Sequence, residues 1–129
     1  MLQKLLSIEE IESIESEVGS LLPPDVREKY LETDGYCGPS ECRLLYPLHD
    51  SGNHNILRAN MLKSEEWFPE VHQNFIILGD DGVGNLLCFD PAVPEAVIWN
   101  PADGARIQER RATVSELWDL VFEQYASAT

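Results

Sequence analysis

The clearest pattern of apolar and polar positions lies between Phe75 and Asp90, where two short apolar runs enclose a glycine-rich turn. Phe75 to Leu78 and Leu86 to Phe89 have the length of β-strands, and three glycines, two aspartates and an asparagine lie between them. These residue types tolerate positive φ angles or accept hydrogen bonds from their own backbone. The pattern therefore predicts a β-hairpin with buried strands and a turn that presents carboxylates to solvent.

Two helices are predicted before this hairpin. Ser7 and Glu10 have the spacing of a capping box, and an apolar face follows until Gly19 ends the pattern. Pro23-Pro24-Asp25 begins a second helix, because proline fits the first helical turn, and Asp34-Gly35 ends it. The apolar face of the first helix consists of Ile8, Ile11, Ile14 and Val18.

The middle third has the weakest pattern. It predicts a loop from Tyr36 to Glu41, a strand from Arg43 to Leu48 and a polar turn from His49 to Asn55. The next segment, Ile56 to Leu62, has no clear period.

After the hairpin, Ala96 to Trp99 predicts another strand and Asn100 to Gly104 a turn. Thr113 and Glu116 form a second capping box at the start of a final helix. Its apolar stripe consists of Val114, Leu117, Trp118, Val121, Phe122 and Tyr125. The stripe predicts packing on the sheet, although a stripe this wide also suits a dimer interface.

Consecutive strands between terminal helices predict an α+β fold with a largely antiparallel sheet flanked by N-terminal and C-terminal helices. The 129 residues suit a single domain, residues 1–129, which buries about two-thirds of the surface of the unfolded chain. Neither an internal repeat nor a linker divides the sequence.

The charge of the chain indicates which kinds of partner it attracts and repels. The chain has 23 Asp and Glu against 9 Lys and Arg, a formal charge of −14, which repels nucleic acid and anionic lipid. From Ser64 to Ala105, here called the acidic segment, there is no Lys or Arg. Its eight carboxylates are Glu65, Glu66, Glu70, Asp80, Asp81, Asp90, Glu95 and Asp103. The segment predicts a docking surface for a basic partner, with solubility alone as the alternative.

The sequence also bears on location and redox state. The first residues lack the apolar region of a secretory signal, and no apolar run approaches the roughly 20 residues of a membrane span. We therefore expect a cytoplasmic protein with no membrane partner. Three cysteines are an odd set, so we expect reduced thiols, with Cys88 buried in its strand.

Several short motifs occur in a characteristic order: Glu17 to Leu31, Thr-Asp-Gly at 33–35, the hairpin, Val-Ile-Trp at 97–99 and Thr-Val-Ser-Glu-Leu-Trp at 113–118. This order, from about Ile11 to Phe122, resembles the SUKH superfamily, which includes the Smi/Knr cell-wall regulators of yeast and many bacterial immunity proteins. One departure is that Asp34-Gly35-Tyr36 stands where the family usually has Asn-Gly-Gly.

The resemblance implies a non-catalytic binding domain, most often an immunity protein that neutralises a secreted or contact-delivered toxin, commonly a nuclease. A nuclease needs a basic cleft for its substrate, which an acidic protein can reach quickly and cover. The candidate contacts are Asp80, Asp81, Asn85, Glu65, Glu66, Trp67 and Trp99. The alternative is that Trp99 belongs to the core and that the turn residues serve backbone geometry alone. The alternative function is a regulatory scaffold that binds a cellular partner.

Other chemistries are disfavoured. Cys37, Cys42, His49 and His54 are the ligand types of tetrahedral zinc, but the gap between the pairs is about half that of zinc fingers. Pro91 stands where an EF-hand needs glutamate, which leaves at most a weak calcium site in the hairpin turn. No catalytic motif is present, so we expect no enzyme activity and no cofactor or metal. A small-ligand carrier would need a deep apolar pocket.

Overall fold

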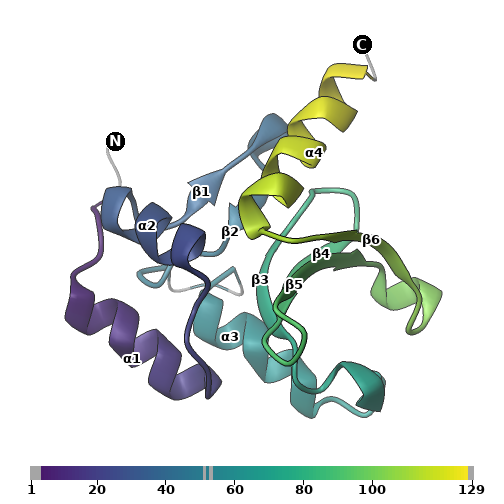
Figure 1. Cartoon of the computed structure of the whole chain (residues 1–129), viewed down its shortest axis with the longest axis horizontal. Coiled ribbons are helices and arrows are strands. Elements are labelled where there is room, and N and C mark those ends of the chain that lie inside the picture. Colours follow the sequence, from purple (N-terminus) through teal and green to yellow (C-terminus); the bar gives the residue numbers. More distant parts are fainter. Residues whose placement is uncertain (1–3, 51, 53, 128–129) are drawn as a thin grey trace.

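The computed structural model of the chain describes residues 4–50, 52 and 54–127. These residues form helices and two antiparallel sheets, one of two strands and one of four (Figure 1). The α-helices are α1 (Ile8–Val18), α2 (Pro24–Glu32), α3 (Ile56–Asn60) and α4 (Val114–Ser127). The strands are β1 (Tyr36–Cys37), β2 (Arg43–Leu45), β3 (Ile76–Asp80), β4 (Leu86–Asp90), β5 (Glu95–Trp99) and β6 (Ile107–Arg111). Short 3₁₀ helices are η1 (Pro39–Glu41), η2 (Met61–Ser64), η3 (Glu70–His72) and η4 (Pro101–Asp103).

The main sheet has the strand order β3-β4-β5-β6, with every neighbouring pair antiparallel. In the predicted hairpin, Ile76 lies opposite Phe89 and Asp80 lies opposite Leu86. The two-stranded sheet β1-β2 is separate, but its second strand passes close to β3. The α+β class and the antiparallel hairpin are therefore confirmed.

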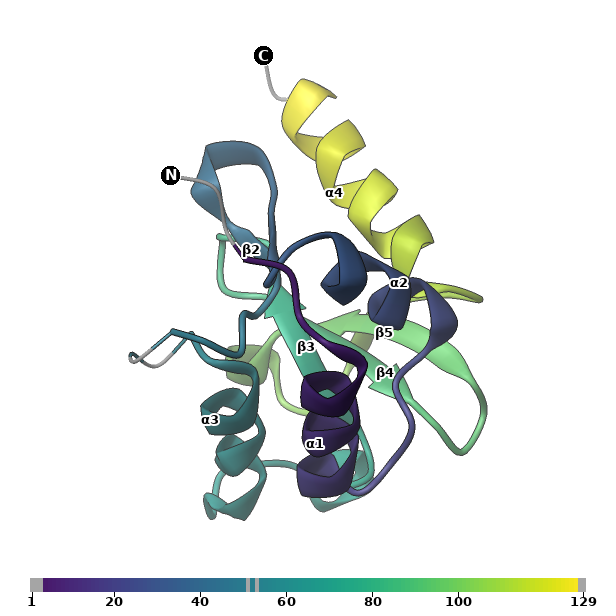
Figure 2. The same cartoon turned by 90° about the vertical axis from the view of Figure 1, so that its left-hand side faces the viewer.

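The helices cover the sheet from two sides. The last helix, α4, packs against β5 and β6, whereas α3 packs against β3 and α1. Figures 1 and 2 show α4 at the top of the molecule, and α1 and α3 beside each other below the sheet. The side chains of Leu44, Ile77, Leu87, Val97 and Leu117 are fully buried between these layers.

Both terminal helices begin at the predicted caps. Ser7 Oγ accepts a hydrogen bond from the Glu10 backbone N–H, and Glu10 Oε1 accepts one from Ser7 N–H, which completes the capping box of α1. Gly19 ends α1 with a φ of 79°, a left-handed conformation that glycine adopts without steric cost. At α4, Thr113 Oγ1 accepts from the Glu116 backbone N–H at 3.3 Å.

The apolar patterns are confirmed except at their ends. Ile11 and Ile14 are buried on α1, but Ile8 is 56% exposed. On α4 the first four residues of the predicted stripe are buried against the sheet. Phe122, one turn from the end, is 40% exposed.

The structure corrects the prediction for the middle of the chain. The strand predicted over Arg43 to Leu48 ends at Leu45, because Asp34 accepts the backbone N–H groups of Leu48 and His49 and turns the chain away. The predicted loop contains β1, and the segment without a clear period is α3 followed by η2. Residues 51 and 53 of the predicted polar turn lie outside the described residues. Strand β6 was not predicted.

None of the helices in the described ranges is both long and apolar enough to cross a membrane.

Candidate functional site

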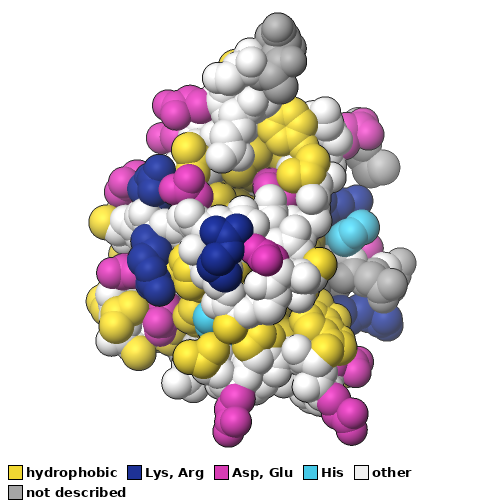
Figure 3. Space-filling model, turned by 90° about the vertical axis from the view of Figure 1, so that its right-hand side faces the viewer, with side chains coloured by type: hydrophobic (Ala, Val, Ile, Leu, Met, Phe, Trp, Pro, Cys, Tyr) yellow, Lys and Arg dark blue, Asp and Glu magenta, His cyan; other side chains and the backbone are white. Residues whose placement is uncertain are grey.

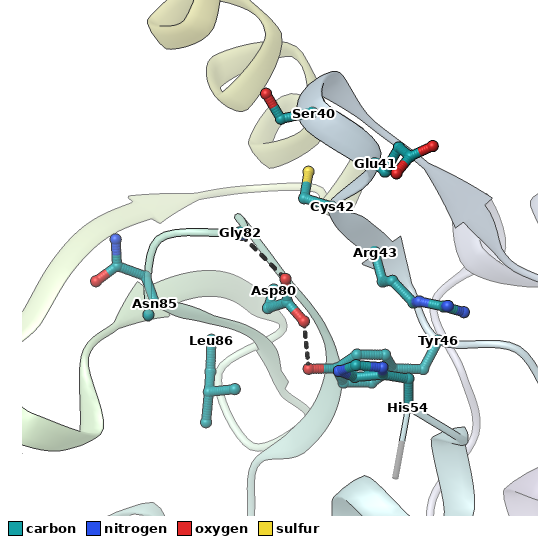
Figure 4. A pocket seen from close by; sticks show the side chains of 11 residues that line it. Ser40, Glu41, Cys42, Arg43, Tyr46, His54, Asp80, Gly82, Asn85 and Leu86 are labelled. Carbon is teal, nitrogen blue, oxygen red and sulfur yellow. Dashed lines mark hydrogen bonds between the residues drawn. The ribbon is translucent and has the colours of Figure 1, made fainter. Parts of the chain in front are cut away.

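An open pocket of about 510 Å³ lies where the β3–β4 turn meets η1 and the start of β2 (Figure 4). We call it the Asp80 pocket, because Figure 4 shows this carboxylate at its centre, between Cys42 and Tyr46. Its lining residues are Ser40, Glu41, Cys42, Arg43, Tyr46, His54, Asp80, Gly82, Gly84, Asn85 and Leu86. Residues of η1 and β2 thus form one concave surface with residues of the β3–β4 turn.

The two aspartates of the β3–β4 turn have different environments. Asp80 is partly buried, and its Oδ1 accepts from Gly82 N–H at 2.9 Å while its Oδ2 accepts from the Tyr46 hydroxyl at 2.8 Å. Asp81 is only 3% exposed. Its carboxylate accepts bonds from the Val83 backbone N–H and from both the backbone and side-chain N–H of Asn85, at 2.6–3.1 Å. Asp81 therefore shapes the turn, as expected for an aspartate at such a position.

The opposite wall has an unusual backbone. Ser40 and Glu41 in η1 have φ angles of 55° and 61°, in the left-handed region that residues with a Cβ rarely adopt. Consecutive residues of this kind store strain, which tertiary contacts must hold. Cys42 follows with its backbone N–H bonded to Pro39 O, and Glu41 is left exposed at the rim of the pocket.

The pocket has an excess of negative charge. Arg43 bonds Asp50 at 3.2 Å, so the nearest guanidinium is already paired. Neither Asp80 nor Asp81 forms an ion pair with a Lys or Arg of the described residues. Burial first, and then the Asp80 carboxylate, raise the pKa of the Tyr46 hydroxyl. Tyr46 therefore stays a neutral donor to Asp80.

The remaining predicted contacts lie elsewhere. Glu65, Glu66 and Trp67 are exposed in the segment after η2, which Figure 1 shows at the bottom of the molecule, away from the β3–β4 turn beside α4. Trp99 is fully buried, and its Nε1–H donates to Cys88 Sγ at 3.3 Å. The interpretation of Trp99 as a core residue is confirmed. Because Trp99 and Asp81 offer no side-chain surface, we leave both out of the proposed contacts.

Sequence reasoning brought Asp80, Asp81 and Asn85 together, but it missed Glu41 and Tyr46. The Tyr46 hydroxyl bonds a carboxylate 34 positions away, and no periodicity connects these residues. The close approach follows from Gly79, where a Cβ would lie 2.3 Å from the carbonyl oxygen of Leu44 in β2. A glycine inside an apolar strand is a weak signal for such an approach, and the sequence offered only that signal.

The four residues considered for zinc are not assembled. His49 pairs with the Glu10 carboxylate on α1, whereas Cys42 and His54 line the Asp80 pocket. In the part of the chain that the structure describes, no three His, Cys, Asp or Glu side chains form a group suited to a metal ion.

The thiols differ in accessibility, which predicts their order of labelling. Cys37 is exposed, whereas Cys42 and Cys88 are buried, and burial raises the pKa of Cys42, and that of Cys88 to about 12. The buried thiols keep their protons at pH 8, and the thiol form is a poor nucleophile. We expect iodoacetamide to modify Cys37 rapidly and the other two slowly, as followed by mass spectrometry.

Denaturant should make all three labelling rates similar, and native labelling of Cys88 at the rate of Cys37 would contradict the burial of its strand.

The raised pKa of the Cys88 thiol also predicts how alkali affects the stability of the fold. The unfolded chain loses this thiol proton near pH 9.0, whereas the folded state keeps it up to about pH 12. The free energy of unfolding should therefore fall as the pH rises through this interval.

The comparison with curated proteins finds no match for this chain. The model of the SMI1 / KNR4 family (SUKH-1) matches residues 5–120, which includes every described strand, α1 to α3 and the first half of α4. The match confirms the resemblance that the order of motifs indicated. The chain belongs to the SMI1 / KNR4 family (SUKH-1).

Proposed function

We propose that this protein is a non-catalytic immunity protein, which binds a basic toxin domain, such as a nuclease, and neutralises it through an acidic surface. The chain belongs to the SMI1 / KNR4 family (SUKH-1), and the superfamily that its motifs resemble includes many bacterial immunity proteins, which supports the class. The observation that carries the proposal is uncompensated negative charge on the acidic segment. Such charge attracts and orients a basic partner.

The ion pairs show which carboxylates are compensated. Arg106 pairs with Asp103, and Arg110 in β6 pairs with Glu95. The other six carboxylates of the acidic segment have no Lys or Arg partner among the residues described. On the face that Figure 3 shows, cationic side chains at mid-height have acidic ones beside them, and further acidic side chains project at the lower edge.

A second feature supports protein binding. Trp67 is 50% exposed and Val71 is 74% exposed, and three exposed glutamates lie in the same short segment. We call this surface the Trp67 patch; it consists of Glu65, Glu66, Trp67, Glu70 and Val71. Tryptophan is a frequent hot-spot residue of protein interfaces.

The direct test is capture of partners from the native host at low and then moderate salt, with identification by mass spectrometry. The proposal predicts a basic toxin domain that elutes as the salt concentration rises, because screening weakens attraction between exposed charges. Recovery of cellular enzymes or cell-wall proteins alone would favour the regulatory scaffold and overturn the proposal.

Charge reversal at the Trp67 patch should slow association with such a toxin. We expect the double variant Glu65→Lys, Glu66→Lys to lower the association rate constant about ten-fold at low salt, because steering depends on local charge. Stopped-flow fluorescence measures this rate. The matched control is Glu12→Lys, Glu17→Lys, which changes two exposed glutamates of α1 and the net charge by the same amount.

If both double variants slow association equally, net charge alone steers the toxin and the Trp67 patch is not a contact. If neither does, the glutamates of the Trp67 patch do not steer the toxin, and the patch is not the docking surface.

A further inference from the structure

We propose that the Asp80 pocket receives a guanidinium group, the side chain of an arginine on the basic partner. This inference rests on the proposed function and deepens it, because it names the chemical group that one part of the acidic surface recognises. It is carried by the shape, the charge and the flat side chains of the pocket.

The Asp80 carboxylate has unused capacity to accept hydrogen bonds. Each of its oxygens accepts one hydrogen bond, from Gly82 N–H or from the Tyr46 hydroxyl. An ionised carboxylate offers about four lone-pair sites, so half of its capacity remains. No cation of the described residues pairs with this partly buried carboxylate. Both contacts hold the group at the centre of an open pocket (Figure 4).

The pocket cannot neutralise its own charge. Among the described residues that line it, Arg43 is the only Lys or Arg, and Figure 4 shows this side chain directed away from Asp80. Its guanidinium instead bonds Asp50. Glu41 adds a second, exposed carboxylate at the rim and has no ion pair within the described ranges. An incoming cation therefore meets the Asp80 carboxylate, with additional negative charge from Glu41 at the rim and no free Lys or Arg among the described lining residues.

The flat side chains of the pocket favour arginine over lysine. The rings of Tyr46 and His54 stack with centroids 6.0 Å apart and an interplanar angle of 19°, and His54 is exposed. A guanidinium is planar, so it can stack on such a ring while its N–H groups bond a carboxylate. An ammonium is a compact, strongly hydrated point charge without a planar face, so it cannot combine stacking with forked hydrogen bonds in this way. The volume of about 510 Å³ also admits the backbone that carries the side chain.

The test uses N-acetyl-arginine amide as the probe and the ¹⁵N-labelled protein. The backbone amide signals of Gly82 and Gly84 report on the pocket, because both residues line it. We expect saturable shifts of these signals with the arginine probe, weaker ones with N-acetyl-lysine amide, and none with the neutral isostere N-acetyl-citrulline amide. Equal shifts from arginine and citrulline, or arginine shifts spread evenly over all exposed carboxylates, would overturn the inference.

Charge-removing variants locate the effect. Asp80→Asn should lower the affinity for the arginine probe about ten-fold, since hydrogen bonds to charged groups are strong. Because Asp80 also supports the turn, Glu41→Gln provides an independent variant. We expect it to lower the affinity for the arginine probe about two- to five-fold. The matched control, Glu12→Gln on α1, should leave the affinity unchanged. Unaltered affinity in Glu41→Gln and Asp80→Asn alike would contradict the assignment.

The same probe separates this inference from the proposed function. If a basic toxin is captured but neither the toxin nor the arginine probe shifts the amide signals of Gly82 and Gly84, the pocket assignment fails and the proposed function stands. If the arginine probe binds while no basic partner is captured, the function fails and the pocket remains a guanidinium site.

Discussion

Replacing Trp99 with alanine is expected to lower the free energy of unfolding by about 3–5 kcal/mol, the range for large aromatic residues truncated in a core. Trp99 is fully buried, and its ring packs edge-on against Phe68 and His72. The variant loses these contacts and the hydrogen bond to Cys88 Sγ. Urea denaturation followed by far-UV circular dichroism measures the change. The loss is a large fraction of the 5–15 kcal/mol typical of whole domains.

Trp67→Ala is the matched control. This tryptophan also contacts Phe68, but half of its surface is exposed, so its removal leaves a smaller cavity. We expect a clearly smaller loss than for Trp99→Ala, together with weaker toxin binding. Equal destabilisation by the two variants would contradict the separation into a core tryptophan and a surface tryptophan.

Replacing Gly79 with alanine is expected to cost about 3 kcal/mol, at the upper end of what overpacking usually costs. A Cβ at this position would lie 2.3 Å from Leu44 O and 2.4 Å from Arg43 O. Both are backbone atoms, so no side-chain rotation relieves the contact, and β2 must move away from β3. We also expect altered amide signals at Gly82, because this movement separates Tyr46 from Asp80. Urea denaturation and ¹⁵N spectra provide the two measurements.

Gly19→Ala separates the steric effect from backbone strain. Gly19 has a φ of 79°, but a Cβ there meets nothing within 4 Å. Left-handed strain alone costs about 1–2 kcal/mol. If Gly79→Ala were no more destabilising than Gly19→Ala, the close packing of β2 on β3 would be disproved.

The elements that the sequence predicted correctly are those with strong local signals. The β3–β4 hairpin joins two apolar runs through turn-forming residues, and α1 begins with a complete capping box. Both signals depend on residues within a few positions of each other. They also place the hairpin turn, and hence Asp80 and Asn85, before any tertiary contact is known.

The missed elements lack such signals for physical reasons. Strand β6 has one apolar residue, Ile107, because it lies at the edge of the sheet, where charged side chains discourage pairing with other chains. Helix α3 spans five residues, which is too short for a helical period to appear. Its start depends on Asn55, whose side chain accepts the N–H groups of Leu57 and Arg58.

The candidate site could be predicted only in part. Asp80 and Asp81 are adjacent and identical in type, yet the structure buries one and directs the other into the pocket. The Asp81 carboxylate is held by Val83 and Asn85 within the turn, whereas the Asp80 carboxylate bonds the distant Tyr46 hydroxyl, and the Tyr125 hydroxyl of α4 bonds the backbone oxygen of Asp81. A pattern along one chain does not encode which distant segments meet.

The central claim, that this acidic protein neutralises a basic toxin by covering it, is tested most directly by titrating the captured toxin with purified protein and measuring residual toxin activity at two salt concentrations. The account predicts complete loss of activity at about equimolar protein at low salt, with weaker inhibition as salt rises. Full toxin activity in the presence of excess protein at low salt would contradict it.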